Sequence, residues 1–239
     1  MNKTNFKNGI VASIGNGDRL VEDAKLMLEC ERFPTSYALA VLAQEEYAKA
    51  LLLSLVDAGA IPWSAEIKHA LHDHVCKQLV SVILEYLSPD IDEFLRRHDL
   101  SQIGKPRPIF PTDVLDAIQV ICHERIPRKH ERWWLDPSDR PLNQRVMAIA
   151  DGCLDRQKQY AIYVHIGKTG EVCSRPSQVL VEDVKVEVGR SERIGNQLRP
   201  YDRVPGLPND LDSEKLIALF RLLTGTLLPE DFNSYWWAR

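Results

Sequence analysis

Tyr37-Ala-Leu-Ala-Val-Leu-Ala-Gln-Glu-Glu-Tyr-Ala-Lys49 is the stretch that decides the fold, and a mostly apolar run continues from it to Val56. A helix formed by these residues would be apolar on nearly every side. Helices of that kind lie in the middle of a protein, surrounded by other elements. The stretch therefore predicts a central helix over residues 35–56, with other helices packed around it.

Three charged residues interrupt this apolar helix: Glu45, Glu46 and Lys49. Charged side chains are almost never fully buried unless they are paired. Lys49 follows Glu45 by four residues and Glu46 by three, and side chains at both spacings meet on one face of a helix. Two interpretations remain open, a partly buried ion pair and a polar site held in the core of a bundle.

The composition is that of an ordinary globular protein, with 239 residues, 44% hydrophobic and 27% charged. A net charge of -4 argues against a broadly basic surface for nucleic acid, although a small basic cleft is compatible with it. The five cysteines are odd in number and form no Cys-x-x-Cys pair, which favours reduced thiols. Without a signal-peptide pattern or an uninterrupted apolar span, we expect a cytoplasmic protein with no membrane partner.

Helical periodicity recurs along most of the chain. Apolar residues at helical spacing predict helices over 18–31, 64–86, 112–121, 142–160 and 177–198. Asp18, Ser64 and Ser177 are the expected caps of three of them, and Thr112-Asp113 is the expected start of a fourth. We expect residues 1–17 to be a lead-in, a short helix over 91–97, and a last helix from Asp212 or Ser213. Residues 179–188 also alternate as a strand would. The expected fold is an all-α bundle with a hairpin-like turn near Gly167.

Three histidines, His69, His72 and His74, occur in the predicted helix over 64–86. Glu66-x-x-His69 has the spacing of a ligand pair in a di-metal bundle, but such a site needs a second pair that the sequence lacks. We therefore expect no metal and no other cofactor. His74 and Lys77 lie one turn apart on the flank of the apolar face.

Three motifs together carry a family resemblance. They are Glu45-Glu46-x-x-Lys49-Ala50, then His74-x-x-Lys77, and then Lys158 followed by Tyr163-Val164-His165 with Gly167, Gly170 and Pro176 after it. This pattern resembles that of AbiV-type abortive-infection proteins, which belong to the HEPN group of helical defence, toxin and RNase domains. His165 departs from the family pattern, in which an Asp is usual at that position.

The resemblance implies an HEPN-like helical bundle over 18–198, with residues 199–239 forming a C-terminal loop and helical tail outside it. It also implies a homodimer, because HEPN domains generally form dimers. Within the bundle, the resemblance would place His74 and Lys77 opposite the charged residues of the central helix.

Arg125-Ile-Pro-Arg-Lys-His130 fits the Arg-x4-His form of catalytic HEPN RNases. In those enzymes the Arg supports the charge of a phosphate-centred transition state and the His moves protons. Pro127 interrupts the motif and is costly inside a helix. The pattern is also short enough to occur by chance.

Two functions follow from the resemblance. The first is an anti-phage effector that inhibits translation or cleaves RNA without a metal. The second is a non-catalytic module that binds a phage or host protein. In it, a buried polar network fixes the helix packing and is formed by Glu45, Glu46, Lys49, His74, Lys77 and Lys158. The residues expected to carry catalysis under the first are Glu46, Lys49, His74, Lys77, Arg125, His130, Lys158 and His165.

Overall fold

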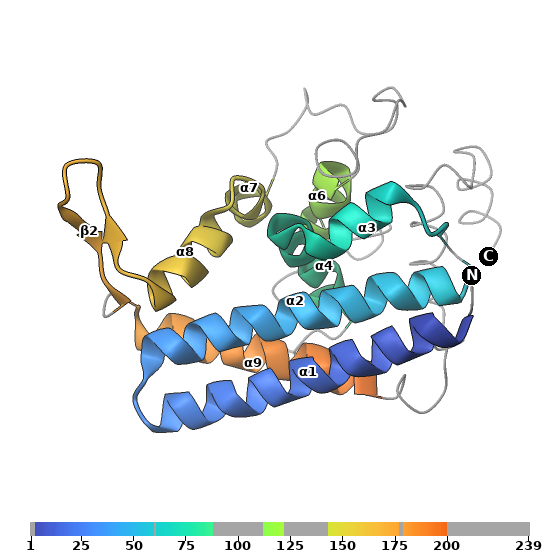
Figure 1. The fold of residues 1–239 in the computed structure, drawn as a ribbon, viewed down its shortest axis with the longest axis horizontal. Helices are drawn as coiled ribbons and strands as arrows, with labels where there is room; N and C mark the ends of the chain where they lie inside the picture. Colours follow the sequence, from blue (N-terminus) through green and yellow to red (C-terminus); the bar gives the residue numbers. More distant parts are fainter. Residues whose placement is uncertain (1–2, 60, 88–111, 122–142, 177–178, 200–239) are drawn as a thin grey trace, which may run out of the picture.

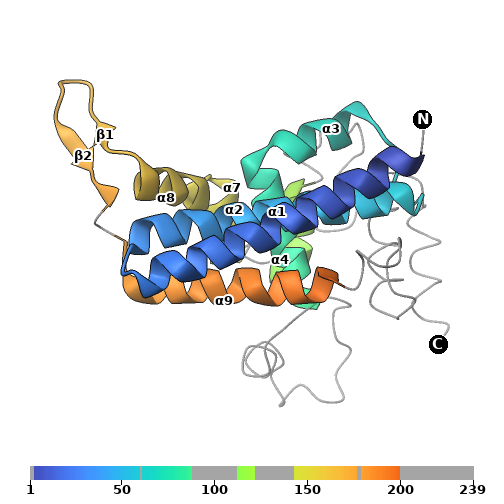
Figure 2. The ribbon, with the colours of Figure 1, turned by 60° about the horizontal axis from the view of Figure 1, so that its bottom comes forward.

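The computed structural model describes residues 3–59, 61–87, 112–121, 143–176 and 179–199, and these are overwhelmingly helical (Figure 1). The two longest helices, α1 (Lys3–Glu29) and α2 (Phe33–Asp57), form an antiparallel pair. A third long helix, α9 (Val181–Leu198), packs along both of them (Figure 2). The expected all-α bundle is confirmed.

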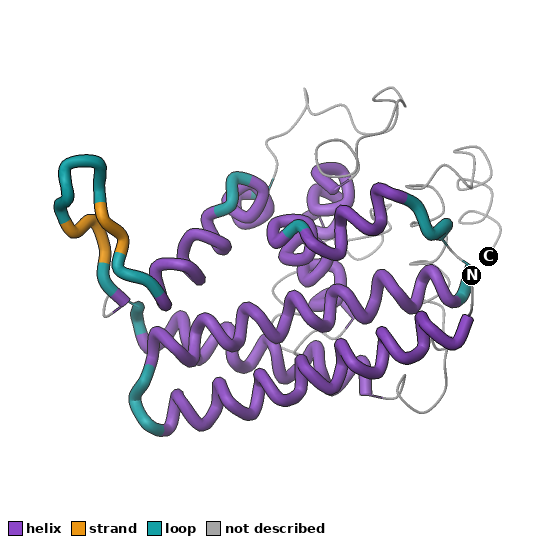
Figure 3. The backbone as a smooth tube through the Cα atoms, viewed as in Figure 1, coloured by secondary structure: helices purple, strands orange, loops and turns teal. Residues whose placement is uncertain are grey.

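The other described elements are shorter. They are α3 (Ala65–His72), α4 (His74–Leu87), α6 (Thr112–Val120), α7 (Gln144–Ala150), α8 (Cys153–Ile162), β1 (His165–Ile166) and β2 (Val172–Ser174). Helices α4 and α8 both contact α2, while α6 and α7 contact α4. The two short strands pair antiparallel in a hairpin that projects from the end of α8 (Figure 3). This confirms the turn expected near Gly167.

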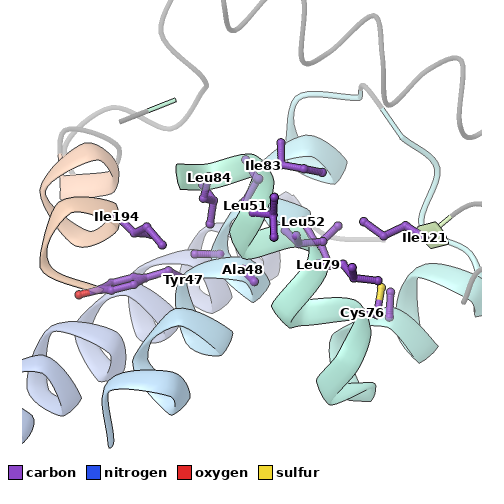
Figure 4. Packing of buried hydrophobic residues seen from close by; sticks show 14 of the residues in the cluster. Tyr47, Ala48, Leu51, Leu52, Cys76, Leu79, Ile83, Leu84, Ile121 and Ile194 are labelled. Atoms are coloured by element: carbon purple, nitrogen blue, oxygen red, sulfur yellow. The ribbon is translucent and has the colours of Figure 1, made fainter. Parts of the chain in front are cut away.

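Helix α2 is the centre of the molecule, as its composition predicts. Of its 25 residues, 16 are buried, and they face α1, α4, α8 and α9 in turn. Leu51 and Leu52 pack against α4 at Leu79 and Ile83 (Figure 4). Within the described part of the chain, no helix combines the length and the hydropathy needed to span a membrane.

The first helix was predicted too short. Residues 1–17 were expected to be a lead-in and Asp18 a helix cap, but α1 runs without a break from Lys3 to Glu29. Glycine lowers helix stability by only about 1 kcal/mol per residue, so Gly15 and Gly17 do not end the helix once its apolar face is packed. Asp18 lies in the middle of α1 and accepts a hydrogen bond from the Tyr47 hydroxyl at 2.7 Å.

Two predicted helices are each divided in two. The helix over 64–86 begins with the expected Ser64 cap, which accepts from the Ile67 amide at 3.3 Å, but it breaks at Asp73. The Asp73 carboxylate accepts from the Cys76 amide at 3.0 Å and so begins α4. The helix over 142–160 breaks at Gly152, whose φ of 74° lies in the left-handed region that glycine tolerates best.

Two further predicted elements lie within the described residues, and two lie outside them. Residues 181–198 form helix α9, so the strand interpretation of 179–188 is wrong. Helix α6 begins at Thr112 as predicted. The helices predicted over 91–97 and from residue 212 onward lie outside the described residues.

The ring of Tyr47 packs against the backbone of two other helices, at positions occupied by glycine. A Cβ placed on Gly17 of α1 would lie 2.5 Å from the ring, and one on Gly195 of α9 would overlap the hydroxyl end. Tyr47 itself is fully buried. The three longest helices therefore approach closely at this level because two of them carry no side chain there.

A methyl group at either glycine should destabilise the protein. In Gly17→Ala and Gly195→Ala, overpacking against Tyr47 costs about 1–3 kcal/mol and exceeds the gain in helix propensity of about 1 kcal/mol. Thermal unfolding should show a melting temperature several degrees below wild type. Gly15→Ala is the matched control, since nothing lies within 4 Å of its added Cβ. It should melt at or above the wild-type temperature, and equal effects at all three positions would contradict the packing argument.

The buried carboxylate of Glu85 links helix α4 to helices α7 and α9. Glu85 accepts from Arg190 Nε at 2.6 Å and from Arg145 Nη2 at 2.7 Å. Arg190 also pairs with Glu187, whose other carboxylate oxygen accepts from Gln44 Nε2 at 2.8 Å. Burial alone would raise the pKa of Glu85, but the two guanidinium groups outweigh it and lower the pKa to about 2.

This pKa makes stability depend on pH in the acid range. Because the pKa of Glu85 is lower in the folded state, its contribution is present above its ordinary value of 4.5 and is lost as pH falls toward 2. A shift of that size corresponds to about 3 kcal/mol. Denaturant unfolding of Glu85→Gln should give a lower free energy at pH 7 and a flatter decline than wild type between pH 4.5 and 2. The exposed Glu182→Gln should keep the wild-type slope, and an unchanged slope in Glu85→Gln would refute the assignment.

Candidate functional site

Glu45 lies at the centre of a polar cluster inside the bundle. Its side chain, on α2, is only 2% exposed. Helix α4 contributes His74, Lys77 and Gln78, which share one face because they are three and four residues apart. Helix α8 contributes Lys158. Three helices that are distant in sequence thus place their polar groups around one carboxylate.

Both oxygens of the Glu45 carboxylate are fully engaged. Oε2 lies 2.6 Å from His74 Nδ1 and 3.0 Å from Lys77 Nζ. Oε1 accepts from Lys158 Nζ at 2.7 Å and from Gln78 Nε2 at 3.0 Å. The side chains of Lys77 and Lys158 are 6% and 7% exposed, whereas that of His74 is 50% exposed. The cluster is therefore buried except on its histidine side.

The electrostatics keep Glu45 ionised. Burial by itself would raise the pKa of Glu45, but the charges of Lys158 and Lys77, with the hydrogen bond from Lys158, outweigh burial and lower that pKa. An ionised carboxylate cannot donate a hydrogen bond, so the short contact with His74 requires a proton on Nδ1. In the neutral imidazole, Nε2 is then the unprotonated nitrogen.

Lys158 touches more than Glu45. Its Nζ also lies 2.7 Å from Asp155 Oδ1 and 3.1 Å from His74 Nδ1. Glu45, His74 and Asp155 each offer one atom suited to bind a metal, and these atoms lie within 4.8 Å of one another. These are the residues of the cluster that could hold a cation.

The structure brings together three of the eight residues expected from the sequence: His74, Lys77 and Lys158. Glu46 and Lys49 pair with each other at 2.5 Å, so the alternative pairing of Lys49 with Glu45 is wrong. His165 is exposed on β1, where its ring lies 5.4 Å from that of Tyr160.

Arg125 and His130 lie outside the described residues. Their proposed roles stay a prediction.

Sequence reasoning included Glu45 in a buried polar network but not at its centre or among the catalytic residues, and it did not single out Gln78 or Asp155. Local spacing drew attention to Lys49 as the partner of Glu45, but the actual partners come from α4 and α8. Two signals were available. Gln78 follows His74 by four residues and Asp155 precedes Lys158 by three, so each shares a helix face with a predicted site residue.

Removing the central charge should cost far more than removing its neighbour. Glu45→Gln leaves two buried lysines without their shared counterion, and breaking a buried ion pair in this way costs about 3–5 kcal/mol. Glu46→Gln is the matched control, because it removes only a partly exposed pair worth up to about 1 kcal/mol. Urea unfolding monitored by circular dichroism measures both, and similar losses would show that Glu45 does not organise the cluster.

Comparison with known families adds an independent result. The family model described as AbiV matches residues 5–196, which is most of the chain and includes every residue of the cluster. Comparison with curated proteins and with solved structures found no match. The matched range contains α1 through α8 and most of α9. The chain therefore belongs to the AbiV family of HEPN domains, and this membership points to abortive infection, a bacterial defence against phage.

Proposed function

We propose that the chain acts in abortive infection as a metal-independent ribonuclease in which His74 transfers the proton. The observation that carries this proposal is the pairing of a half-exposed imidazole with a buried, ionised carboxylate, at 2.6 Å between His74 Nδ1 and Glu45 Oε2. In hydrolytic enzymes, a carboxylate in this position fixes the histidine tautomer and stabilises the imidazolium that forms.

The chemistry would begin at Nε2. As a general base, His74 Nε2 would take the proton of a ribose 2′-hydroxyl, and the resulting oxygen would attack the adjacent phosphate. The bond to the 5′-oxygen would break and that oxygen would take a proton from water, leaving a 2′,3′-cyclic phosphate and a 5′-hydroxyl. Glu45 would stabilise the protonated ring until His74 returns its proton to the solvent. The charges of Glu45 and Asp155 are already balanced by Lys77 and Lys158, so the ring can gain a proton without a second buried group changing its ionisation.

The charge of the site favours a phosphate only when His74 is protonated. Glu45 and Asp155 balance Lys77 and Lys158, so the imidazolium would supply the net positive charge among the ionisable residues of the cluster. Further cations for the phosphate would come from outside the cluster, and Arg125 is the candidate from the sequence. A homodimer, which HEPN domains generally form, would bring a second copy of Arg125 and His130 to the substrate.

A second candidate function is a non-catalytic module that binds a phage or host protein. The burial of Lys77 and Lys158, at 6% and 7% exposure, favours it, because both ammonium groups contact Glu45 rather than an open surface. Under this alternative the cluster fixes how α2, α4 and α8 pack, and the half-exposed His74 has no chemical task.

Cleavage of RNA in EDTA separates the two candidates. Wild type should cut and leave 2′,3′-cyclic phosphate ends, while a substrate lacking the 2′-hydroxyl should stay intact. His74→Ala should lower the rate by a factor on the order of 100 or more, the usual contribution of a general base. His69→Ala is the matched control, since His69 is also a helical histidine but is 64% exposed and contacts Asp73 at 3.7 Å. It should cut at the wild-type rate.

Three other outcomes would reassign the function, provided that circular dichroism shows each variant to be folded. Cutting that survives His74→Ala but is lost in Arg125→Ala or His130→Ala would place the chemistry in the Arg-x4-His motif. Cutting that requires a divalent metal would refute the metal-independent mechanism. Absence of cutting by wild type, at concentrations where its oligomer is intact, would favour the interaction module.

A further inference from the structure

We infer that the ammonium group of Lys158 is the resident cation of this cluster, standing where a divalent metal would bind between Glu45, Asp155 and His74. Lys158 would thereby position the carboxylates of Glu45 and Asp155 without a metal. Metal binding tests this position of the ammonium group whether or not the proposed ribonuclease activity is found.

The geometry that supports this is the convergence of three potential metal ligands on one nitrogen. Lys158 Nζ lies 2.7 Å from Glu45 Oε1, 2.7 Å from Asp155 Oδ1 and 3.1 Å from His74 Nδ1. Two carboxylate oxygens and an imidazole nitrogen are a donor set that Zn²⁺ and Co²⁺ accept. These three residues also form a group whose ligand atoms lie within 4.8 Å of one another.

The distances suit an ammonium ion better than a metal ion. The hydrogen bond from Lys158 Nζ to Glu45 Oε1 is 2.7 Å long, within the usual range of about 2.7–2.9 Å for a charged nitrogen and a carboxylate, and the ion pair with Asp155 Oδ1 has the same length. Zinc instead binds oxygen and nitrogen at about 2.0–2.2 Å. The cluster is therefore wider than a metal site, by an amount that small side-chain movements could close. Lys158 also comes from the same turn of α8 as Asp155, so the cation and one of its ligands are built into one helix.

Lys77 provides an internal comparison. It is as buried as Lys158 and also contacts Glu45, at 3.0 Å, but it approaches the other oxygen, on the side that His74 Nδ1 shares. Removing Lys77 deletes the same positive charge but leaves Lys158 among the three ligand atoms. Removing Lys158 deletes the charge and also vacates the position between those atoms. The two substitutions differ in geometry while changing the net charge equally.

The test is a Co²⁺ titration of the purified full chain, followed by visible absorption. Lys158→Ala should bind about one Co²⁺ per chain, with d–d bands and an affinity at least roughly 10-fold above wild type, the scale on which positioning residues affect metal sites. The metal would replace both the ammonium and the Nδ1 proton, and that proton would leave to solvent. Wild type and Lys77→Ala should show no such bands, and Lys158→Ala with His74→Ala should lose them.

Each result bears on the inference. If Lys158→Ala is unfolded alone, Co²⁺ should restore its helical circular dichroism, and failure to restore it would overturn the inference. A folded Lys158→Ala that binds no Co²⁺ would overturn it as well. So would Co²⁺ binding by wild type that is abolished in His74→Ala, because Lys158 would then not occupy the metal position. The RNA-cleavage assay is separate, and its failure leaves these outcomes unchanged.

Discussion

The burial of one ionised carboxylate, Glu45, is the constraint on which the rest of the arrangement depends. A carboxylate inside a protein is tolerated only when cations and hydrogen-bond donors surround it. Here those partners come from α4 and α8, so both helices must present particular faces to α2. Apolar burial is non-directional, whereas the charged contacts to Glu45 require defined distances and partners. They therefore add a constraint on the register of the three helices.

Much of the fold could be predicted from the sequence, because stretches of apolar residues are the ones that become buried. The stretch around Tyr37–Lys49 is apolar on all sides, and it became the central helix. The boundaries of the helices were harder to predict. A residue near a boundary can adopt either of two local structures, and composition does not decide between them. Asp73 could continue a helix or cap a new one, and its carboxylate settles the matter by binding the Cys76 amide. Gly17 could end a helix or permit close packing, and its contact with the Tyr47 ring shows that it permits close packing.

The site could be predicted only in part, because spacing along one helix carries no information about which helices meet. His74 and Lys77 were linked to each other by their spacing, and to the central helix only by family resemblance. Glu45 and Glu46 are adjacent and chemically identical, yet one faces α4 and α8 while the other pairs with Lys49 at 2.5 Å. A rotation of about 100° per residue separates them, and the sequence alone does not say which face of α2 turns inward.

The contact of Tyr47 with Gly17 and Gly195 has a consequence for how this fold could change over time. The ring fills a space bounded by two backbones, so the three positions are coupled by volume. A smaller residue at position 47 would open a cavity that side chains at 17 and 195 could then fill, whereas either change alone would be unfavourable. Related chains should therefore exchange the large residue and the two glycines together. The positions would covary across three helices although they share no chemical role.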